Sequence, residues 1–247
     1  MGMVAVVGLG ALQPPQQADT KLSPDRTLYA VAERGQRVGK GEERERLVIY
    51  TARGARVAIA HVWLVEPDGV GRAGIRGCED WGWVDSTRLF CEGTINPSTG
   101  IYLVFEAKTG NELHEFVGSH FVWSPDHRYL TNCGNVPQFS SEEGKSDSLE
   151  LQGKPLYPSP GDPEQHWFRS LPVWAADSRA FALVDHRRKQ NTFILIVMTV
   201  SGRLSEFPLV STAESEEWPP SLDYELRWDG RRIVVQHHGT QQIVNIT

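Results

Sequence analysis

Cysteine is scarce in this chain of 247 residues, and no apolar run is long enough to cross a bilayer. The three cysteines, Cys78, Cys91 and Cys133, have neither CxxC nor cysteine–histidine spacing, so the sequence gives no support for a zinc site. They cannot form a complete disulfide framework, and whether Cys78 pairs with Cys91 stays open. The N-terminal apolar run Met3–Leu12 has ten residues, too few for a membrane-spanning helix. We therefore expect no integral membrane span.

An excess of basic charge is also missing, because the formal net charge is −6. A negative chain has no general attraction for nucleic acid or for anionic membranes, so neither is expected as a partner. Hydrophobic residues make up 40% of the chain and charged residues 23%, which are ordinary globular values and argue against disorder. The length allows one large all-β domain or two small ones.

Catalytic signatures are absent as well. The chain has no G-x-S-x-G elbow, no phosphate-binding glycine loop and no H-E-x-x-H motif. The adjacent pair His237-His238 is the nearest approach to a metal pattern. Successive residues of a strand point to opposite sides, so the two imidazoles are not expected to share one ion. No catalytic residue, metal ligand or cofactor is predicted.

A repeat is what the sequence does contain. The segment Phe121–Leu130, FVWSPDHRYL, has the pattern of a strand, a tight turn and a second strand, because proline presets one turn position and aspartate can bond the backbone just beyond it. Four degraded copies accompany it. The turn aspartates are Asp25, Asp85, Asp126, Asp177 and Asp229, separated by 60, 41, 51 and 52 residues. Their role is predicted to be structural.

The distances within a repeat vary less than those between repeats. Four of the aspartates are followed 29, 25, 27 and 25 residues later by the glycines Gly54, Gly110, Gly153 and Gly202. We interpret each repeat as strand A, an aspartate turn, strand B, a loop, strand C, a glycine turn and strand D. Short β-rich repeats of this length indicate propeller blades. The eight tryptophans are expected to occupy equivalent positions in successive repeats.

We therefore predict an all-β fold, a β-propeller of about five four-stranded blades in one domain over residues 21–247, preceded by an apolar segment and a Gln/Pro linker over residues 1–20. The turn glycine of the fifth repeat would fall beyond Thr247, so the last blade is expected to lack strand D. Two interpretations of the N-terminus stay open. Val4–Val7 supplies the missing strand, or residues 1–18 are the remnant of a secretory signal with Met3–Leu12 as its apolar region. The signal remnant implies a periplasmic or secreted protein, and the closing strand a cytoplasmic one. The chain being a fragment of a larger propeller also stays open.

Several of the repeats resemble a known family. Ser23–Ala30 (SPDRTLYA), Trp123–Leu130 (WSPDHRYL) and Trp174–Leu183 (WAADSRAFAL) resemble the WD-like repeats of TolB-type β-propellers, and Trp83–Cys91 and Trp228–Val235 follow the pattern more loosely. The resemblance extends over most of the chain, from Lys21 to Thr247. It implies a propeller fold. It does not imply one function, because propellers serve many.

The predicted blades place all long connections on one face, where binding is expected because loops on a rigid scaffold usually carry it. These connections are Glu33–Arg46, Gly93–Gly100, Gly134–Asp147 and Asp185–Asn191 between strands B and C, and His61–Asp80, Tyr157–Arg169 and Ser211–Asp223 between strands D and A. The predicted binding residues are basic: Arg34, Arg37, Lys40, His186, Arg187, Arg188 and Lys189. The alternative is that they belong to solvated loops, since Glu33, Glu42, Glu43 and Glu45 offset the charge.

The function predicted from these features is non-catalytic binding or scaffolding through the long-loop face, with another protein as the partner. The alternative is a glycan-acting hydrolase with carboxylates lining a central channel, for which Asp80, Asp185 and Asp223 are the candidates at strand ends. Two or three carboxylates converging within about 5–10 Å would favour the hydrolase. Nothing in the sequence indicates the oligomeric state.

Overall fold

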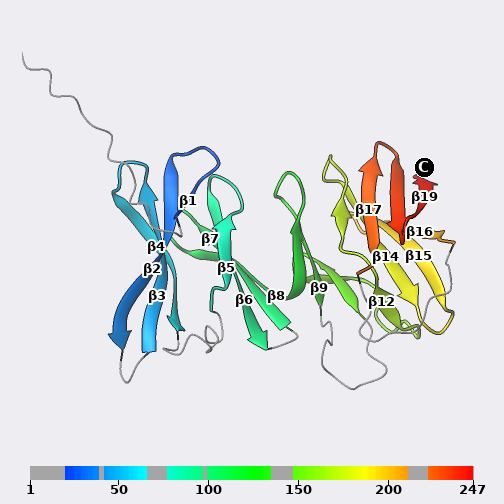
Figure 1. The fold of residues 1–247 in the computed structure, drawn as a ribbon, viewed down its shortest axis with the longest axis horizontal. Coiled ribbons are helices and arrows are strands. Elements are labelled where there is room, and N and C mark those ends of the chain that lie inside the picture. The colour runs from blue at the N-terminus through cyan, green and yellow to red at the C-terminus, as the bar shows by residue number, and fades with distance from the viewer. Residues whose placement is uncertain are drawn as a thin grey trace, which may run out of the picture. The chain divides into compact units, whose positions relative to one another are not determined.

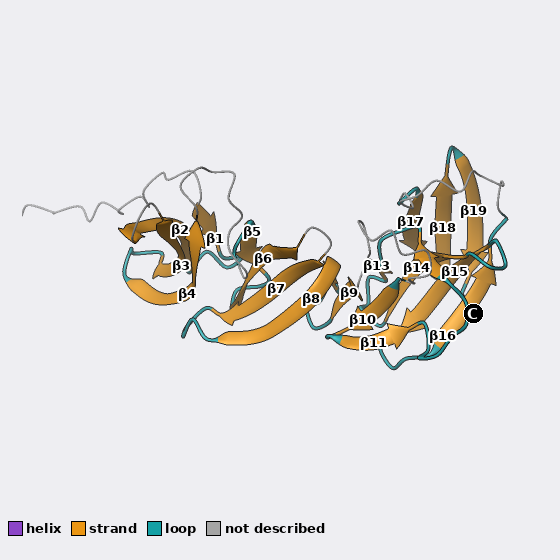
Figure 2. Cartoon of the chain, turned by 90° about the horizontal axis from the view of Figure 1, so that it is seen from below, coloured by secondary structure: helices purple, strands orange, loops and turns teal. Residues whose placement is uncertain are grey.

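The computed structural model describes residues 20–38, 42–65, 77–96, 99–134, 147–210 and 222–246. Within these residues every regular element is a strand, and the strands form antiparallel sheets (Figure 1 and Figure 2). The predicted all-β class is confirmed. No helix among the described residues is long and apolar enough to cross a membrane.

The described residues divide into two compact units. The first takes the described residues up to Gly93 together with Tyr102–Glu115, and the second takes Thr94–Ile101 and the described residues from Phe116 onward. The predicted segment 1–20 lies outside the described residues except for its last residue, Thr20. Both interpretations of the N-terminus therefore stay predictions, as does the single domain over residues 21–247.

The first repeat is a four-stranded meander in the order β1-β2-β3-β4. Its strands are β1 (Thr20–Leu22), β2 (Leu28–Val38), β3 (Glu42–Thr51) and β4 (Arg56–Val65). The tight turns fall at Asp25 and at Gly54, where the repeat predicts them, and Gly54 has a φ of 85° that favours glycine. Leu47 and Ile49 on β3 are fully buried, so the apolar run of this repeat forms its central strand.

The predicted loop Glu33–Arg46 is instead mostly strand. β2 continues to Val38 and β3 begins at Glu42, with Arg34 opposite Glu45 and Arg37 opposite Glu43 in the ladder. Glu33 and Arg46 form an ion pair at 2.9 Å. The prediction of a loop was wrong because charged residues can also form a strand, and opposite charges such as those of Glu33 and Arg46 across a ladder favour one.

The second and third repeats share a seven-stranded sheet in the order β11-β10-β9-β8-β7-β6-β5. Its strands are β5 (Asp80–Trp83), β6 (Arg88–Asn96), β7 (Thr99–Glu106), β8 (Glu112–Trp123), β9 (Leu130–Gly134), β10 (Ser148–Leu151) and β11 (Lys154–Tyr157). The predicted loop Gly93–Gly100 is therefore largely strand. β8 joins strand D of one repeat to strand A of the next, and its register shifts between Ser119 and Val122. A bulge of this kind redirects a strand without ending it.

The fourth repeat is sandwiched between its neighbours in the second compact unit. Its strands are β12 (His166–Phe168), β13 (Val173–Trp174), β14 (Ala180–Arg187), β15 (Thr192–Thr199) and β16 (Leu204–Pro208). One face of β14 and β15 packs against the third repeat through Phe181, Leu183 and Ile196, and the other packs against the fifth through Ala182, Val184 and Leu195. Burial of both faces explains why these strands are continuous apolar runs.

The fifth repeat is a three-stranded sheet in the part of the chain that the structure describes. Its strands are β17 (Tyr224–Asp229), β18 (Arg232–His237) and β19 (Thr240–Asn245). These correspond to strands A, B and C of the predicted fifth repeat. Val4–Val7, which one of the two open interpretations makes the closing strand, lies outside the described residues.

The aspartate turns have one recurring chemistry. In the first, third and fourth repeats the aspartate Oδ1 accepts the backbone N–H two residues on, at 3.0–3.1 Å. The residue after each of these aspartates has a positive φ of 56–60°. The structural role predicted for the turn aspartates is thereby supported for Asp25, Asp126 and Asp177. Polar turn residues tolerate this backbone because their side chains bond locally.

Tryptophan side chains link successive repeats in an equivalent way. The indole N–H of Trp83 donates to the carbonyl of Lys21 at 2.9 Å, that of Trp174 to Val122 at 3.2 Å, and that of Trp228 to Val173 at 2.8 Å. Each acceptor lies in or beside strand A of the preceding repeat within the same compact unit. Three of the eight tryptophans thus occupy the equivalent positions predicted for them.

Replacing Ser124 with alanine is expected to lower the free energy of unfolding by about 1–2 kcal/mol. The fully buried Ser124 hydroxyl donates to Asp126 at 2.7 Å and accepts the Tyr129 N–H at 3.0 Å, so its loss leaves that partly buried N–H without its acceptor. Urea unfolding followed by fluorescence measures the change. Ser159→Ala, at an exposed serine, is the matched control, and an equal effect in both variants would contradict the prediction.

Candidate functional site

The candidate site lies where the connections leave the long-loop end of the fourth repeat. β12 pairs with the end of β14, with His166 opposite Arg187 and Phe168 opposite Asp185. The connection Tyr157–Arg169, predicted to be a loop, therefore contains a strand. The prediction was wrong because the aromatic run at residues 166–168 is short, yet all three of its side chains are buried against β14.

Two loops are fastened to each other above this strand pair, and we name Pro158–Gln165 and Arg188–Asn191 together the loop platform. The Arg188 N–H donates to the Gln165 carbonyl at 2.9 Å, and the Lys189 N–H donates to the Glu164 carboxylate at 2.7 Å. The Lys189 ammonium also donates to the Pro163 carbonyl. These contacts join loops from two different connections into one surface.

A buried polar network lies beneath the platform, and we name Asp147, Tyr157, His166, Asp185 and Arg187 the carboxylate network. Asp185 Oδ2 is its centre. It accepts the Tyr157 hydroxyl and His166 Nδ1, each at 2.7 Å, and lies 3.8 Å from Arg187 Nε. The side chains of Asp185 and His166 are fully buried. Asp185 Oδ1 is also buried and has no hydrogen-bond partner among the described residues.

Burial and neighbouring charges shift the pKa values of several groups in the network. Burial lowers the pKa of His166, but the hydrogen bond and charge of Asp185 outweigh it, with help from Asp162, and the net direction is upward. Burial raises the pKa of Asp147 to about 7, against the hydrogen bond from the Phe168 N–H and with the charge of Asp185 adding to it. The pKa of Tyr157 is raised by burial and then by Asp185.

These groups are the right types for acid–base chemistry, but they are placed to hold the fold. A general acid or base must lie within hydrogen-bond reach of its substrate. The side chains of His166 and Asp185 have no exposed surface, and Asp147 is 5% exposed. The network instead ties the end of β11 to β12 and to β14, which anchors the loop platform. The sequence pointed to Asp185 but not to His166, Tyr157 or Asp147.

A second polar cluster lies at the same end of the fifth repeat. Arg169 donates to both oxygens of Asp223, with Nε to Oδ1 at 3.0 Å. Asp223 Oδ2 lies 3.2 Å from His237 Nε2 and 3.8 Å from His238 Nε2. The hydrogen bonds and charge of Arg169 and His237 outweigh burial and lower the pKa of Asp223.

The expectation that the two imidazoles point apart was wrong. β18 ends at His237, and His238 leaves the strand with a φ of 43°, so strand alternation does not apply to it. Ligand atoms of Asp223, His237 and His238 lie within 4.8 Å of one another. Arg169 already supplies the positive charge that a cation would bring and would repel one. We therefore assign this cluster to the ion pair.

The predicted binding residues on the fourth repeat are bonded within the chain. His186 is buried, stacks on Phe193 with ring centroids 4.3 Å apart, and faces Asn191 at 3.0 Å. Arg187 pairs with Glu206 and donates to Tyr157. Their neighbours Arg188 and Lys189 lie in the loop platform, and the Arg188 guanidinium lies 3.6 Å from the Trp167 ring centroid. A binding role for these four residues stays a prediction.

The other predicted binding residues belong to the first repeat. Arg34 and Arg37 lie on β2. Lys40 lies outside the described residues. A binding role for these three residues stays a prediction.

The three carboxylates proposed for a hydrolase have different partners. Asp185 and Asp223 belong to the separate clusters described above, and both are mostly buried. Asp80 lies in the other compact unit, where its side chain is 66% exposed and pairs with Lys21 at 3.2 Å. Each carboxylate thus has a local structural role.

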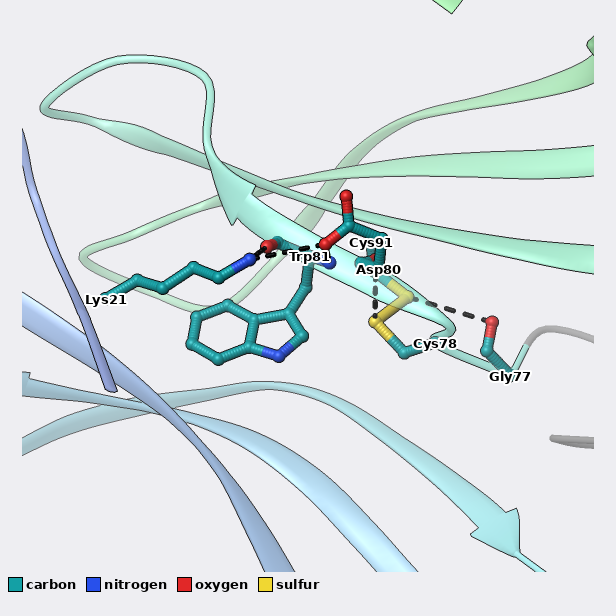
Figure 3. The surroundings of a disulfide bond; sticks show 6 residues. All are labelled: Lys21, Gly77, Cys78, Asp80, Trp81 and Cys91. Atoms are coloured by element: carbon teal, nitrogen blue, oxygen red, sulfur yellow. Dashed lines mark hydrogen bonds and ion pairs between the residues drawn. A yellow bond between two sulfur atoms is a disulfide. The ribbon is translucent and has the colours of Figure 1, made fainter. Parts of the chain in front are cut away.

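Asp80 lies beside the disulfide bond (Figure 3). Cys78 and Cys91 are bridged, with Cα atoms 5.3 Å apart, so the pairing left open by the sequence is present. The Lys21 ammonium lies 4.7 Å from the Trp81 ring centroid and also donates to the Trp81 carbonyl. The third cysteine, Cys133, is free and buried, and burial raises its pKa. A buried thiol of this kind is unreactive.

Comparison with known proteins gives similarity at the level of structure only. No family model matches the chain, and no curated protein matches it. One similar solved structure is a prolyl endopeptidase, with 13% sequence identity and a TM-score of 0.41 over 88% of this chain and 34% of that chain. Another is the β-propeller domain of the Trilobed protease from Pyrococcus furiosus, with 11% identity and a TM-score of 0.40 over 91% of this chain and 78% of that chain. A third is hydrazine synthase from Kuenenia stuttgartiensis, with 12% identity and a TM-score of 0.38 over 92% of this chain and 70% of that chain. The chain spans about a third of the prolyl endopeptidase chain. TM-scores below 0.5 assign neither a family nor a function.

Proposed function

We propose that this chain is a non-catalytic binding module whose five repeats are propeller blades of the TolB type, and that it binds a partner protein through the loop platform. The blade interpretation is supported by the recurring aspartate turns, the positive-φ glycines and the repeated tryptophan bonds between neighbouring repeats. Ring closure and blade number are part of the proposal.

The observation that carries the binding role is the construction of the platform. Two loops are hydrogen-bonded to each other, and the first contains three prolines, Pro158, Pro160 and Pro163, which restrict its backbone. The carboxylate network anchors both loops from below. A surface that is already ordered loses little conformational entropy when a partner binds, so more of the contact energy appears as affinity.

The exposed groups of the platform suit a polar protein surface. Asp162, Lys189 and Gln190 are exposed, so both signs of charge and an amide are presented together. Mixed polar groups around a fixed backbone are typical of the rim of a non-obligate interface. The glycan hydrolase is less well supported, because the described carboxylates that it would use are buried or paired.

A photocrosslinking residue placed at Lys189 is expected to give a protein adduct in an extract of the native cells. The same residue at Lys108, in the glycine turn of the second repeat, is the control. The adduct should appear only from the platform and should be competed by excess unlabelled chain. Equal labelling from both positions, or none, would contradict the proposal. Turnover of a panel of chromogenic glycosides, lost in Asp223→Asn, would establish the hydrolase instead.

A further inference from the structure

A groove of about 490 Å³ lies between the fourth and fifth repeats, at the opposite end of these strands from the loop platform. It is bounded by the aspartate turn of the fourth repeat, the glycine turn of the same repeat and the turn at Gly230 of the fifth. Its volume falls within the usual range of ligand sites, about 300–1,000 Å³. No motif recognised in the sequence accounts for it.

The groove exists because the side chains between the two sheets become small toward this end. Near the platform the inter-sheet core is filled by Phe193, Leu195 and Tyr224. At the tight-turn end the fourth repeat instead presents small residues, among them Ala180 and Ser205, toward Trp228 of the fifth. Small residues on one of two packed layers leave a gap beside the other layer, so the cavity follows from the sequence at these positions.

Three arginines line this groove, namely Arg179, Arg203 and Arg231. None of their guanidinium groups has a hydrogen-bond or ion-pair partner within the described part of the chain. Their main chains are fixed, since the Arg203 N–H donates to Thr199 Oγ1 at 3.0 Å and the Arg231 carbonyl accepts the Ile246 N–H at 2.8 Å. Rigid backbone with unpaired cationic ends is the arrangement of an anion site.

The local charge opposes the charge of the whole chain. Three guanidinium groups face one carboxylate, that of Asp177, which gives the groove a charge of +2 in a chain of net charge −6. Arginine, rather than lysine, at all three positions favours oxyanions, because the planar guanidinium can donate two parallel hydrogen bonds to a carboxylate or phosphate. Trp228 adds an apolar wall.

We propose that this groove binds a small organic polyanion, with its carboxylate or phosphate groups held by Arg179, Arg203 and Arg231 and its carbon skeleton against Trp228. The site is separate from the loop platform, so this proposal does not depend on the proposed protein partner. A carboxylate and a phosphate group each present two oxygens that one guanidinium can bind, and two probes distinguish them.

Isothermal titration of the full chain with citrate and with pyrophosphate at constant ionic strength tests the site. We expect saturable binding of at least one of the two anions, with glucose as the uncharged control. Arg203→Ala and Arg231→Ala should each weaken that binding by at least about tenfold. Both arginines are exposed, so the variants should keep the melting temperature of the parent chain.

Arg227→Ala is the matched control, because Arg227 is exposed on β17 in the same repeat but does not line the groove. Its affinity should stay within about twofold of the parent chain. Binding of citrate alone identifies a polycarboxylate site, and binding of pyrophosphate alone a phosphate site. Failure of both anions to saturate, or equal weakening by Arg227→Ala, would overturn the proposal.

Discussion

Replacing Asp185 with alanine is expected to lower the free energy of unfolding of the second compact unit by about 3–5 kcal/mol. Asp185 Oδ2 accepts two hydrogen bonds at 2.7 Å, from Tyr157 and from His166, in a place with no solvent. Alanine would leave a buried hydroxyl and a buried imidazole without their acceptor, and each orphaned group carries its own desolvation cost. The loss should appear in urea unfolding as a lower midpoint at an unchanged slope.

Hydrogen exchange locates the effect. Protection should fall in β12 and at the end of β14, where the network joins the strands, while β2 and β3 of the first repeat stay protected. Asp229→Ala is the matched control. Its carboxylate pairs with Arg232 at 2.8 Å, but both side chains are about half exposed. That variant should lose less than about 1 kcal/mol. If the two aspartate variants lost equal stability, the central role given to Asp185 would be wrong.

The parts of the fold that the sequence predicted are those set by local chemistry. The turns at Asp25, Asp126 and Asp177 were predictable because the aspartate, its preceding small residues and the backbone N–H that it bonds lie within a few positions of one another. The turn glycines at 54 and 202 were predictable for the same reason, since a positive φ of 85° at a tight turn selects glycine. Periodic spacing then revealed the repeats.

The site was harder to predict because it is assembled across the sequence. Asp147, Tyr157, His166 and Asp185 span nearly forty positions. Three of them come from β11, β12 and β14, and Asp147 lies just before a fourth strand, β10. No local sequence pattern predicts that β12 pairs with the end of β14. The prediction that the imidazoles of His237 and His238 point apart was wrong for a different reason. The expected alternation depended on where β18 ends, and strand ends are the least predictable feature of a sequence.

Stability near the carboxylate network should depend on pH through Asp147. Burial raises the pKa of this carboxyl from 3.8 to about 7. Between about pH 4 and pH 7 the folded chain therefore binds more protons than the unfolded chain, and the free energy of unfolding falls as pH rises. A rise of the pKa from 3.8 to about 7 corresponds to a loss of about 4 kcal/mol in the free energy of unfolding over this pH range. His166 acts in the same direction, because its raised pKa stabilises the fold at low pH and that stabilisation is lost as pH rises.

Asp147→Asn is therefore expected to be more stable than the parent chain at pH 8, by up to about 4 kcal/mol, and nearly equal to it at pH 4. The asparagine Oδ1 can still accept the Phe168 N–H that Asp147 accepts at 2.7 Å, so the substitution removes the buried charge and keeps the bond. Urea unfolding at half-unit steps from pH 4 to pH 8 measures the difference.

Asp162→Asn is the control for this pH dependence. The hydrogen bond from the Glu164 N–H lowers the pKa of Asp162, so this carboxylate has no buried charge to relieve and its variant should gain nothing at pH 8. A gain for Asp147→Asn that persists at pH 4 would mean better packing, not relief of a buried charge. No gain at pH 8 would mean that the Asp147 carboxylate is solvated in the folded chain, and the burial given to this corner of the network would be wrong.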